Sequence, residues 1–360
     1  MKSIALSCIL TLFVCSAFSQ TPLRVAVAGL SHGHVDWIFN RAEKSDIELV
    51  GIFEENPDLV ERYAKRYNID KSLFFSTLED MLKEVKPDAV SAFGAISDHV
   101  TVVRACAPRK VHVMVEKPLA TTLADAKEIE VLANKNNIHV LTNFETSWYQ
   151  SNQQVKSMLE DGQLGDLRRV VVNDGHEGPK EIGVSDEFFD ILTDPQKNGA
   201  GALVDFGCYG ANLMTWLMKG ERPISVTAVV HQNKPHIYKN VDDEATIILQ
   251  YPRAQCVIQA SWNWPFSRKD MEVYGTKGYA IAEDATTLAT RLKHGSERQT
   301  IELAARPAPF DDPFSVLNAV VKGTLVLEEN DLYGLRVNVA TVEILEAAIR
   351  SAEKSKTVIL

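Results

Sequence analysis

Residues 24–34 read Arg24-Val25-Ala26-Val27-Ala28-Gly29-Leu30-Ser31-His32-Gly33-His34, an apolar, β-rich run that enters a glycine-containing turn. The pattern predicts a strand, a tight turn and then a helix, the arrangement in which backbone amides meet a pyrophosphate. Of the usual G-x-G-x-x-G spacing only the first glycine is present, so the turn alone also fits an ordinary loop. The candidate dinucleotide-binding residues of this turn are Gly29, Ser31, His32, Gly33 and His34.

The surrounding sequence strengthens this interpretation, because apolar runs alternate with amphipathic stretches over the first half of the chain. Continuous apolar strands separated by helices are typical of a parallel sheet covered on both faces. We therefore expect a doubly wound α/β domain, in which ligands lie at the carboxyl ends of the strands. The expected strands are 24–28, 47–53, 89–93, 111–115 and 139–142. One helix is expected to begin near Val35, and four more are expected over 57–67, 77–84, 99–107 and 123–136.

An acidic residue, Glu54, follows the second expected strand about twenty residues beyond the turn. At that position a carboxylate accepts hydrogen bonds from the adenosine ribose hydroxyls and repels a 2′-phosphate. Glu54 therefore favours NAD over NADP. The alternative is a solvated acid at the end of a strand.

The pattern changes after Asn143, and 360 residues suit two domains. We expect a dinucleotide-binding domain over 20–142 and an α+β domain over 143–360. Expected strands in which apolar and polar residues alternate, joined by short links, predict an open, mostly antiparallel sheet in the second domain. A last helical pattern, at 335–352, fits packing on either domain. The second domain's other expected elements are a helix at 153–160 and strands at 226–231, 246–251, 256–262 and 271–274.

The N-terminus has the features of a signal peptide. Lys2 precedes an apolar run from residue 4 to residue 14, and Ala17-Phe18-Ser19 offers a small-x-small cleavage site before Gln20. We interpret residues 1–19 as a removed signal, which predicts an exported, periplasmic protein. A frayed apolar N-terminus is one alternative, and a lipid anchor at Cys15 is another that the bulky Val14 disfavours.

Composition excludes several classes of function. The net charge is −10 at pH 7 and no dense basic block is present, so nucleic acid is not an expected partner. No internal stretch is apolar for long enough to cross a bilayer. Once the signal is removed, three scattered cysteines remain, which is no disulfide framework. The nine histidines are dispersed without the close spacing of a zinc site, so we predict no metal.

Two further segments carry groups suited to proton transfer. Val115-Glu116-Lys117-Pro118 ends the expected strand at 111–115, where a lysine can donate hydrogen bonds to a substrate hydroxyl or carbonyl. Residues 199–209 are expected to open a helix that places Asp205 and Tyr209 on one face, as an acid–phenol pair. Taken singly, these residues also fit a surface lysine, a helix cap and a packed aromatic.

Aromatic and polar residues that suit sugar rings gather in two loops. One loop carries His176, Glu177 and Lys180, and the other carries Trp262, Asn263 and Trp264. Each of them fits loop packing equally well. We take His176, Trp262 and Trp264 as the candidate substrate-binding residues.

Four landmarks in this order resemble the Gfo/Idh/MocA oxidoreductases, a family named for glucose-fructose oxidoreductase, inositol dehydrogenase and a rhizopine catabolism protein. The resemblance covers essentially all of the chain after residue 19. The landmarks are the turn at Gly29, Val115 to Pro118 with the following Leu119-Ala120, the Gly-x-Gly-x-Leu-x-Asp-x-Gly-x-Tyr pattern at Gly199 to Tyr209, and Val273-Tyr274-Gly275-Thr276-Lys277-Gly278.

The resemblance implies a Rossmann domain, a substrate domain whose sheet often forms a homo-oligomer interface, and hydride transfer between nicotinamide and a sugar-like alcohol. Lys117, preceded by Glu116, would contact both cofactor and substrate, and Asp205 would bind substrate hydroxyls. Tyr209 would transfer the proton, at a position where many members carry histidine. Tyrosine there resembles the branch with glucose-fructose oxidoreductase and dihydrodiol dehydrogenase. Ser31 and His34 stand where the family has glycines, so either the phosphate geometry differs from the usual one or His32 and His34 reach substrate or phosphate.

Three functions remain open at this stage. The first is an exported NAD(P)-dependent oxidoreductase acting on a sugar or glycoside. Because free NAD is not expected outside the cytoplasm, such an enzyme would keep its cofactor tightly bound and regenerate it in each cycle. The second is an NAD-dependent glycosidase that uses transient oxidation and elimination. The third is a non-catalytic sugar or nucleotide binder, which the joint presence of Lys117, Asp205 and Tyr209 disfavours.

Overall fold

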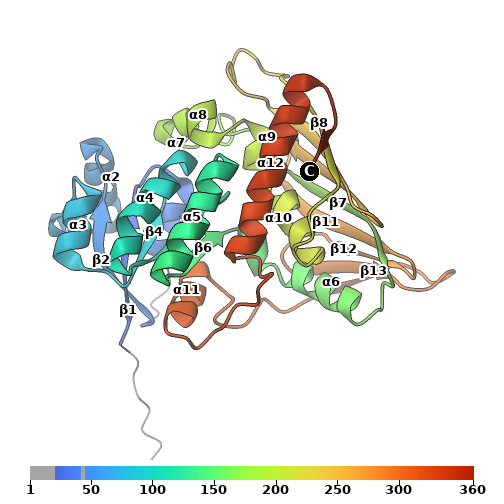
Figure 1. Cartoon of the computed structure of the whole chain (residues 1–360), viewed down its shortest axis with the longest axis horizontal. Helices are drawn as coiled ribbons and strands as arrows, with labels where there is room; N and C mark the ends of the chain where they lie inside the picture. Colours follow the sequence, from blue (N-terminus) through green and yellow to red (C-terminus); the bar gives the residue numbers. More distant parts are fainter. Residues whose placement is uncertain (1–20, 42–44) are drawn as a thin grey trace, which may run out of the picture.

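The computed structural model describes residues 21–41 and 45–360. The expected signal peptide, the cleavage site before Gln20 and the alternative lipid-anchor site at Cys15 lie outside the described residues. Figure 1 shows two domains, with the first half of the chain on the left and a large open sheet on the right.

The first domain is built on a six-stranded sheet in the order β3-β2-β1-β4-β5-β6, with every neighbouring pair parallel. This is the doubly wound order predicted from the sequence. Four strands are completely or mostly buried because helices cover both faces. The strands are β1 (Leu23–Ala28), β2 (Ile47–Phe53), β3 (Phe74–Phe75), β4 (Ala89–Ala92), β5 (His112–Glu116) and β6 (Val140–Asn143).

Four helices of this domain lie within one or two residues of their expected bounds. Polar caps begin three of them, since the side chains of Asn56, Thr77 and Thr122 each accept a hydrogen bond from a backbone N–H of the first turn. The four helices are α2 (Pro57–Tyr67), α3 (Leu78–Val85), α4 (His99–Cys106) and α5 (Leu123–Asn136).

The helix expected after β1 is different. The chain forms a 3₁₀ turn over Gly33–Val35 and then only the four-residue helix α1 (Asp36–Phe39). Arg41, which follows this helix, forms ion pairs with Asp46 and Asp312. The helix expected to begin near Val35 is therefore present but only four residues long.

The second sheet has nine strands in the order β14-β13-β12-β11-β7-β10-β9-β8-β15. It is antiparallel except for the parallel pair β7–β10, which confirms the expected open, mostly antiparallel sheet. Four strands were expected and five more complete the sheet. The strands are β7 (Leu167–Gly175), β8 (Ser225–His231), β9 (Glu244–Gln250), β10 (Gln255–Ser261), β11 (Arg268–Gly275), β12 (Tyr279–Ala282), β13 (Thr287–Arg291), β14 (Gln299–Glu302) and β15 (Val358–Ile359).

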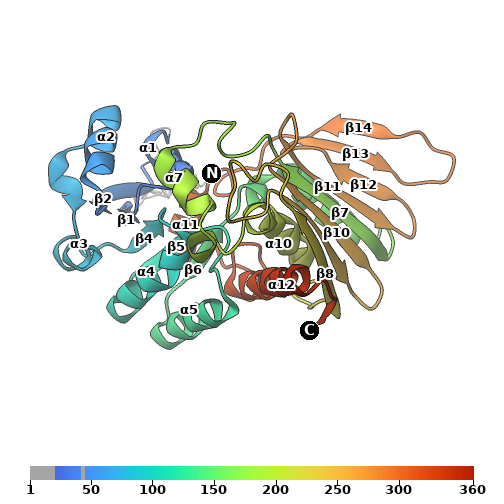
Figure 2. The same cartoon turned by 90° about the horizontal axis from the view of Figure 1, so that it is seen from above.

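Helices cover one face of this sheet. They are α6 (Gln150–Glu160), α10 (Gly207–Leu217) and α12 (Leu335–Lys354), and the opposite face carries no helix among the described residues (Figures 1 and 2). Helix α12 resolves the ambiguity left by the sequence because it contacts both domains, packing on α10 and β8 and also on α5. Val339 and Val342 join the first domain's core, and Ile344 and Leu345 join the second's.

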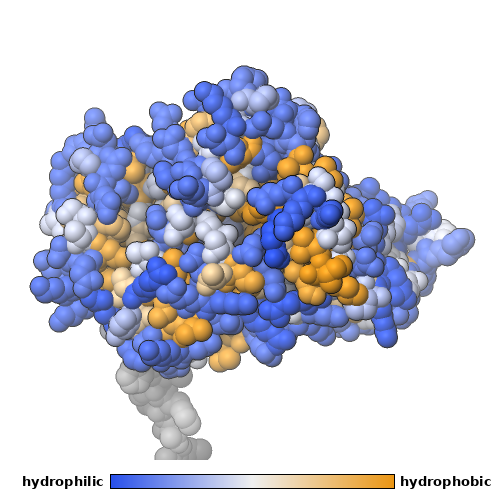
Figure 3. Space-filling model, turned by 45° about the horizontal axis from the view of Figure 1, so that its top comes forward, coloured by the Kyte–Doolittle hydropathy of each residue, from blue (hydrophilic) through white to orange (hydrophobic). Residues whose placement is uncertain are grey.

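Three short helices, α7 (Asp186–Leu192), α8 (Pro195–Asn198) and α9 (Ala202–Asp205), precede α10. Helix α11 (Pro313–Val321) returns to the first sheet, where Phe314 and Leu317 pack in the core beside β1. Hydrophilic residues cover most of the face seen in Figure 3, and apolar residues reach the surface there in separate patches. Within the described ranges, no helix combines the length and apolarity needed to cross a membrane.

Candidate active site

A cavity of about 200 Å³ lies where the carboxyl edge of the first sheet meets the second domain. It brings together six residues that the sequence analysis singled out from four separate segments. The segment between β7 and α7 closes it with Pro179, Ile182 and Val184. We call this cavity the inner chamber. The six residues are His32, His34, Lys117, His176, Asp205 and Tyr209.

Lys117 and Asp205 form a buried ion pair in the inner chamber. The Lys117 ammonium donates to Asp205 Oδ1 at 2.5 Å and to the Asp205 carbonyl oxygen at 3.0 Å. Burial alone would lower the pKa of Lys117, but the Asp205 carboxylate outweighs burial and raises it. Burial would likewise raise the pKa of Asp205, yet the ammonium holds it below its usual value. Both groups are therefore ionised, and the lysine is fixed in position.

The structure places Trp262 behind Asp205 rather than on the wall of the chamber. Its side chain is completely buried, and its indole Nε1 donates to Asp205 Oδ2 at 3.0 Å. Asp205 is thus held from two sides, and Trp262 orients it without facing substrate. Trp264 lies outside the inner chamber and packs its ring near the Arg268 guanidinium.

The expected single helix carrying Asp205 and Tyr209 is interrupted at Phe206. Asp205 ends α9, Phe206 has non-ideal helical angles (φ −107°, ψ −31°), and Tyr209 lies in the first turn of α10. The aromatic ring of Phe206 also lines the chamber. The two functional side chains still reach the same cavity, although they belong to two helices.

Tyr209 lies between two ammonium groups. Its ring centroid is 5.2 Å from Lys117 Nζ and 4.6 Å from Lys269 Nζ, and its hydroxyl donates no hydrogen bond to any described residue. Burial, together with the carboxyl groups of Glu145 and Asp174, raises the pKa of Tyr209 well above its usual value. The phenol therefore carries its proton at neutral pH.

Lys269 is a site residue that the sequence analysis missed. Its ammonium pairs with Glu145 Oε2 at 2.6 Å, and on β11 it lies opposite Asp174 of β7. Burial disfavours its charge, but Asp174 and Glu145 more than compensate and raise its pKa. A signal was present, because Lys269 shares one face of an alternating strand with the buried Met271 and Val273.

The turn after β1 fits a dinucleotide. Gly29 has φ +86°, and a Cβ there would lie 2.8 Å from the Gly94 nitrogen, so the position requires glycine. A Cβ at Gly33 would meet nothing within 4 Å, which leaves room for a ligand against the backbone. Ser31 is half-buried in the same turn. The Glu54 carboxylate accepts from the Leu30 and Asn56 amides, both at 2.8 Å, and so braces the turn.

The two histidines of the turn face Glu116. His34 Nδ1 lies 2.9 Å from Glu116 Oε2, His32 Nε2 lies 3.9 Å from it, and the Asn143 amide donates to Glu116 Oε1. Burial lowers the pKa of each histidine to about 3, so both are neutral. One donor atom from each of His32, His34 and Glu116 lies within 4.8 Å of the others. Although we expected no metal site, the fold therefore assembles a group of metal-ligand type, in which a direct hydrogen bond already joins His34 to Glu116.

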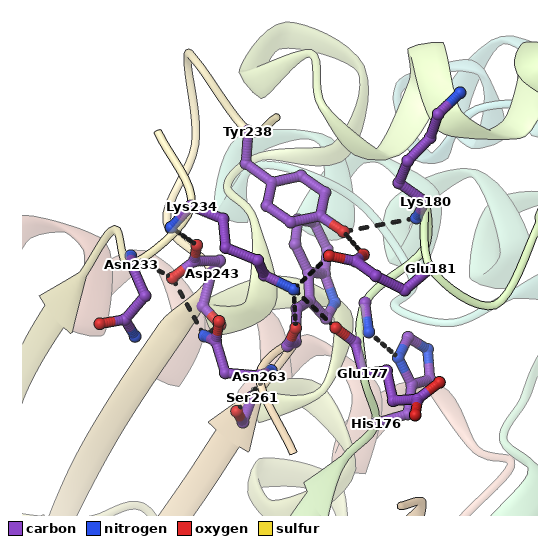
Figure 4. Close-up of polar contacts among 12 residues, drawn as sticks. His176, Glu177, Lys180, Glu181, Asn233, Lys234, Tyr238, Asp243, Ser261 and Asn263 are labelled. Atoms are coloured by element: carbon purple, nitrogen blue, oxygen red, sulfur yellow. Dashed lines mark hydrogen bonds and ion pairs between the residues drawn. The ribbon is translucent and has the colours of Figure 1, made fainter. Parts of the chain in front are cut away.

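Residues 176–184, which close the chamber, are held by hydrogen bonds from the loop that follows β8. Lys234 donates to the Glu177 carbonyl, to Glu181 Oε1 and to the Trp262 carbonyl, each at 2.6 Å. Figure 4 shows its ammonium pointing between these acceptors, while the Lys180 side chain points away from them. Tyr238 donates to the second oxygen of Glu181. His176 Nδ1 accepts from the Gly178 amide, and His176 lines the inner chamber.

Comparison with protein families gives two matches. Residues 23–144 match the model of the oxidoreductase family with an NAD-binding Rossmann fold, and residues 152–281 match the GFO/IDH/MocA C-terminal domain. Together the two matches cover well over half of the chain.

Comparison with individual proteins agrees with the family matches. Trans-1,2-dihydrobenzene-1,2-diol dehydrogenase of Xenopus tropicalis is 26% identical over 272 residues, covering 74% of this chain and 77% of that one. An inositol dehydrogenase homolog from Azotobacter vinelandii, solved with NAD⁺, superposes with a TM-score of 0.81 at 20% identity, covering 94% of this chain and 98% of that one. The aldose-aldose oxidoreductase of Caulobacter crescentus, solved with glycerol, gives 0.76 at 22% identity, covering 94% and 100%.

Proposed function

Because this chain belongs to the Gfo/Idh/MocA family of NAD-binding oxidoreductases, we propose that it transfers hydride between nicotinamide and a hydroxyl-bearing carbon of a sugar or glycoside. One observation carries the proposal. The fixed Lys117–Asp205 pair and the free hydroxyl of Tyr209 share one buried chamber at the carboxyl edge of the first sheet.

The dinucleotide would be held by the turn after β1 and by the ends of β2 and β5. Gly29, Ser31 and Gly33 would contact the phosphates, and Glu54 the adenosine ribose, which favours NAD over NADP. His32, His34 and Glu116, with Lys117, would border the nicotinamide side. When bound, the nicotinamide accepts or returns a hydride.

The chain's own groups would handle the proton. In the reducing direction, the protonated Tyr209 donates to a substrate carbonyl oxygen while Lys117 stabilises the charge on that oxygen. In the oxidising direction, Tyr209 must first release its own proton to solvent, and the resulting phenolate would then accept the proton of a substrate hydroxyl. The two flanking ammonium groups favour the phenolate that receives it. Asp205 fixes Lys117, and the residues that close the chamber exclude water.

The proposal includes export through the N-terminal signal and, as a consequence, a tightly retained cofactor. It also includes a homo-oligomer formed through the uncovered face of the nine-stranded sheet. Exposed apolar side chains such as Val229 and Ile248 lie on strands of that sheet and support such a contact.

The first experiment is to purify the chain from residue 20 onward, denature it and assay the released nucleotide. Near-stoichiometric NAD(H) is expected. Sugars and glycosides are then screened for oxidation, with both net NADH and glycoside cleavage measured, because cleavage without net NADH identifies the redox-neutral glycosidase instead.

Tyr209→Phe should lower the rate of oxidation by about 10²- to 10⁴-fold without loss of bound NAD. Tyr279→Phe, on β12 and outside the chamber, serves as the matched control. Absence of nucleotide and of binding to added NAD or NADP would refute the proposed function.

A further inference from the structure

A second, larger cavity adjoins the inner chamber. Its volume is about 680 Å³, and it shares His176, Phe206 and Lys269 with the chamber as lining residues. Small-molecule sites usually measure about 300–1,000 Å³, so the inner chamber alone, at about 200 Å³, is below that range. The two cavities together offer room for a ligand with more than one ring. We call the larger one the outer cavity.

The outer cavity combines an aromatic rim with fixed polar groups. Phe266 lines it and leaves 63% of its surface exposed, so its ring is accessible to a ligand in the cavity. Tyr149 and Phe206 line it as well, and Ser267 adds a hydroxyl. Flat apolar faces beside fixed polar groups are the combination that recognises a sugar ring, whose C–H face stacks and whose hydroxyls form hydrogen bonds.

The charges of the outer cavity are already paired within the protein. Arg268 forms two hydrogen bonds with Asp270, Lys269 pairs with Glu145, and Glu283 pairs with Arg298. Asp284 accepts from the Thr286 and Thr287 amides. No lining lysine or arginine is left unpaired for a phosphate or carboxylate, so the cavity suits an uncharged ligand and disfavours an anionic one.

One polar group of the wall lacks a partner. Asp174 is completely buried, and neither carboxyl oxygen forms a hydrogen bond with a described residue. Burial raises the pKa of Asp174 well above its usual value. An unsatisfied buried polar group is costly, and a ligand hydroxyl reached by rotation of this side chain would satisfy it.

We infer that the outer cavity is a subsite for a second, uncharged sugar ring, so that the substrate is a neutral glycoside of at least two rings rather than a free monosaccharide. The ring to be oxidised occupies the inner chamber, and the ring linked to it stacks on Phe266. This inference rests on the proposed function, because it assigns the substrate class of the same site.

The test compares substrates of different length on variants of the outer cavity. Methyl β-glucoside and methyl α-glucoside are compared with cellobiose and maltose, and the galactoside lactose is compared with methyl β-galactoside. Binding to the NAD-loaded protein is measured by calorimetry, and turnover is measured in parallel. The preferred disaccharide should bind about tenfold more tightly than its one-ring partner.

Phe266→Ala should remove that advantage while leaving one-ring binding unchanged, and Ser267→Trp should block the disaccharide by filling the cavity. Both side chains are exposed, so neither change threatens folding. Val131→Ala, which removes an equally exposed apolar side chain from α5, is the matched control. Equal binding of one-ring and two-ring ligands, or the same loss for both in Phe266→Ala, would overturn the inference. Failure of every sugar to bind, with NAD present, would count against the proposed function itself.

Discussion

At the scale of single residues, the pKa of the proposed proton-transfer residue Tyr209 is set by charged groups from several elements. Tyr209 is surrounded by Lys117 after β5, Lys269 on β11, Glu145 before α6, Asp174 on β7 and Asp205 on α9. The carboxyl groups and burial raise its pKa, whereas the two ammonium groups favour its phenolate. The rate of oxidation should therefore depend on pH through the pKa of Tyr209. Removing a neighbouring ammonium group should raise this pKa, and removing a neighbouring carboxylate should lower it.

Lys269→Met should move the acidic limb of the pH profile of kcat/KM for oxidation to higher pH, by about one to two units, because an adjacent positive charge is lost. Glu145→Gln should move the same limb to lower pH, because it removes an anion. Steady-state rates from pH 5 to 11 would show both shifts. Lys269→Arg should restore the position of the limb, and Lys239→Met, an exposed charge elsewhere, should not move it. A fall in rate with an unmoved limb would show that Lys269 serves packing alone.

At the scale of elements, the segment that closes the chamber depends on contacts from outside itself. Residues 176–184 contain no helix or strand, and Lys234 holds them by two hydrogen bonds, to the Glu177 carbonyl and to Glu181 Oε1. Lys234→Met should raise KM for the sugar more than it lowers kcat and should speed amide hydrogen exchange in this segment. Lys239→Met is a control from the same loop. Unchanged exchange in residues 176–184 would contradict this role.

At the scale of the whole molecule, α11 and α12 join the two domains. Helix α12 buries side chains in both cores, and α11 packs on the first sheet although it follows β14 of the second sheet in the chain. We expect a single calorimetric unfolding transition. At a free concentration of 100 Kd, NAD should stabilise the entire transition by about 2.7 kcal/mol, although it contacts mainly the first domain. Two resolved transitions, with only one shifted by NAD, would show that the domains unfold independently.

Much of the fold follows from local sequence pattern. Most strands and helices of the first domain were predicted closely, because a buried parallel strand and an amphipathic helix each have a recognisable pattern of apolar residues in the sequence. The four expected strands of the second sheet were found for the same reason. Short strands such as β3 and β15 were missed because two residues carry no clear period, and the small length of α1 was not apparent for a similar reason.

The sequence by itself determined the two kinds of sheet and the segments that supply Lys117, Asp205 and Tyr209, because these depend on short-range pattern and recognisable motifs. Tertiary structure alone decided that Trp262 supports Asp205 from behind, that His32 and His34 meet Glu116, and that Lys269 reaches Tyr209. These contacts join residues between 57 and 84 positions apart in the chain. They depend on strand register and domain packing, which no local period encodes.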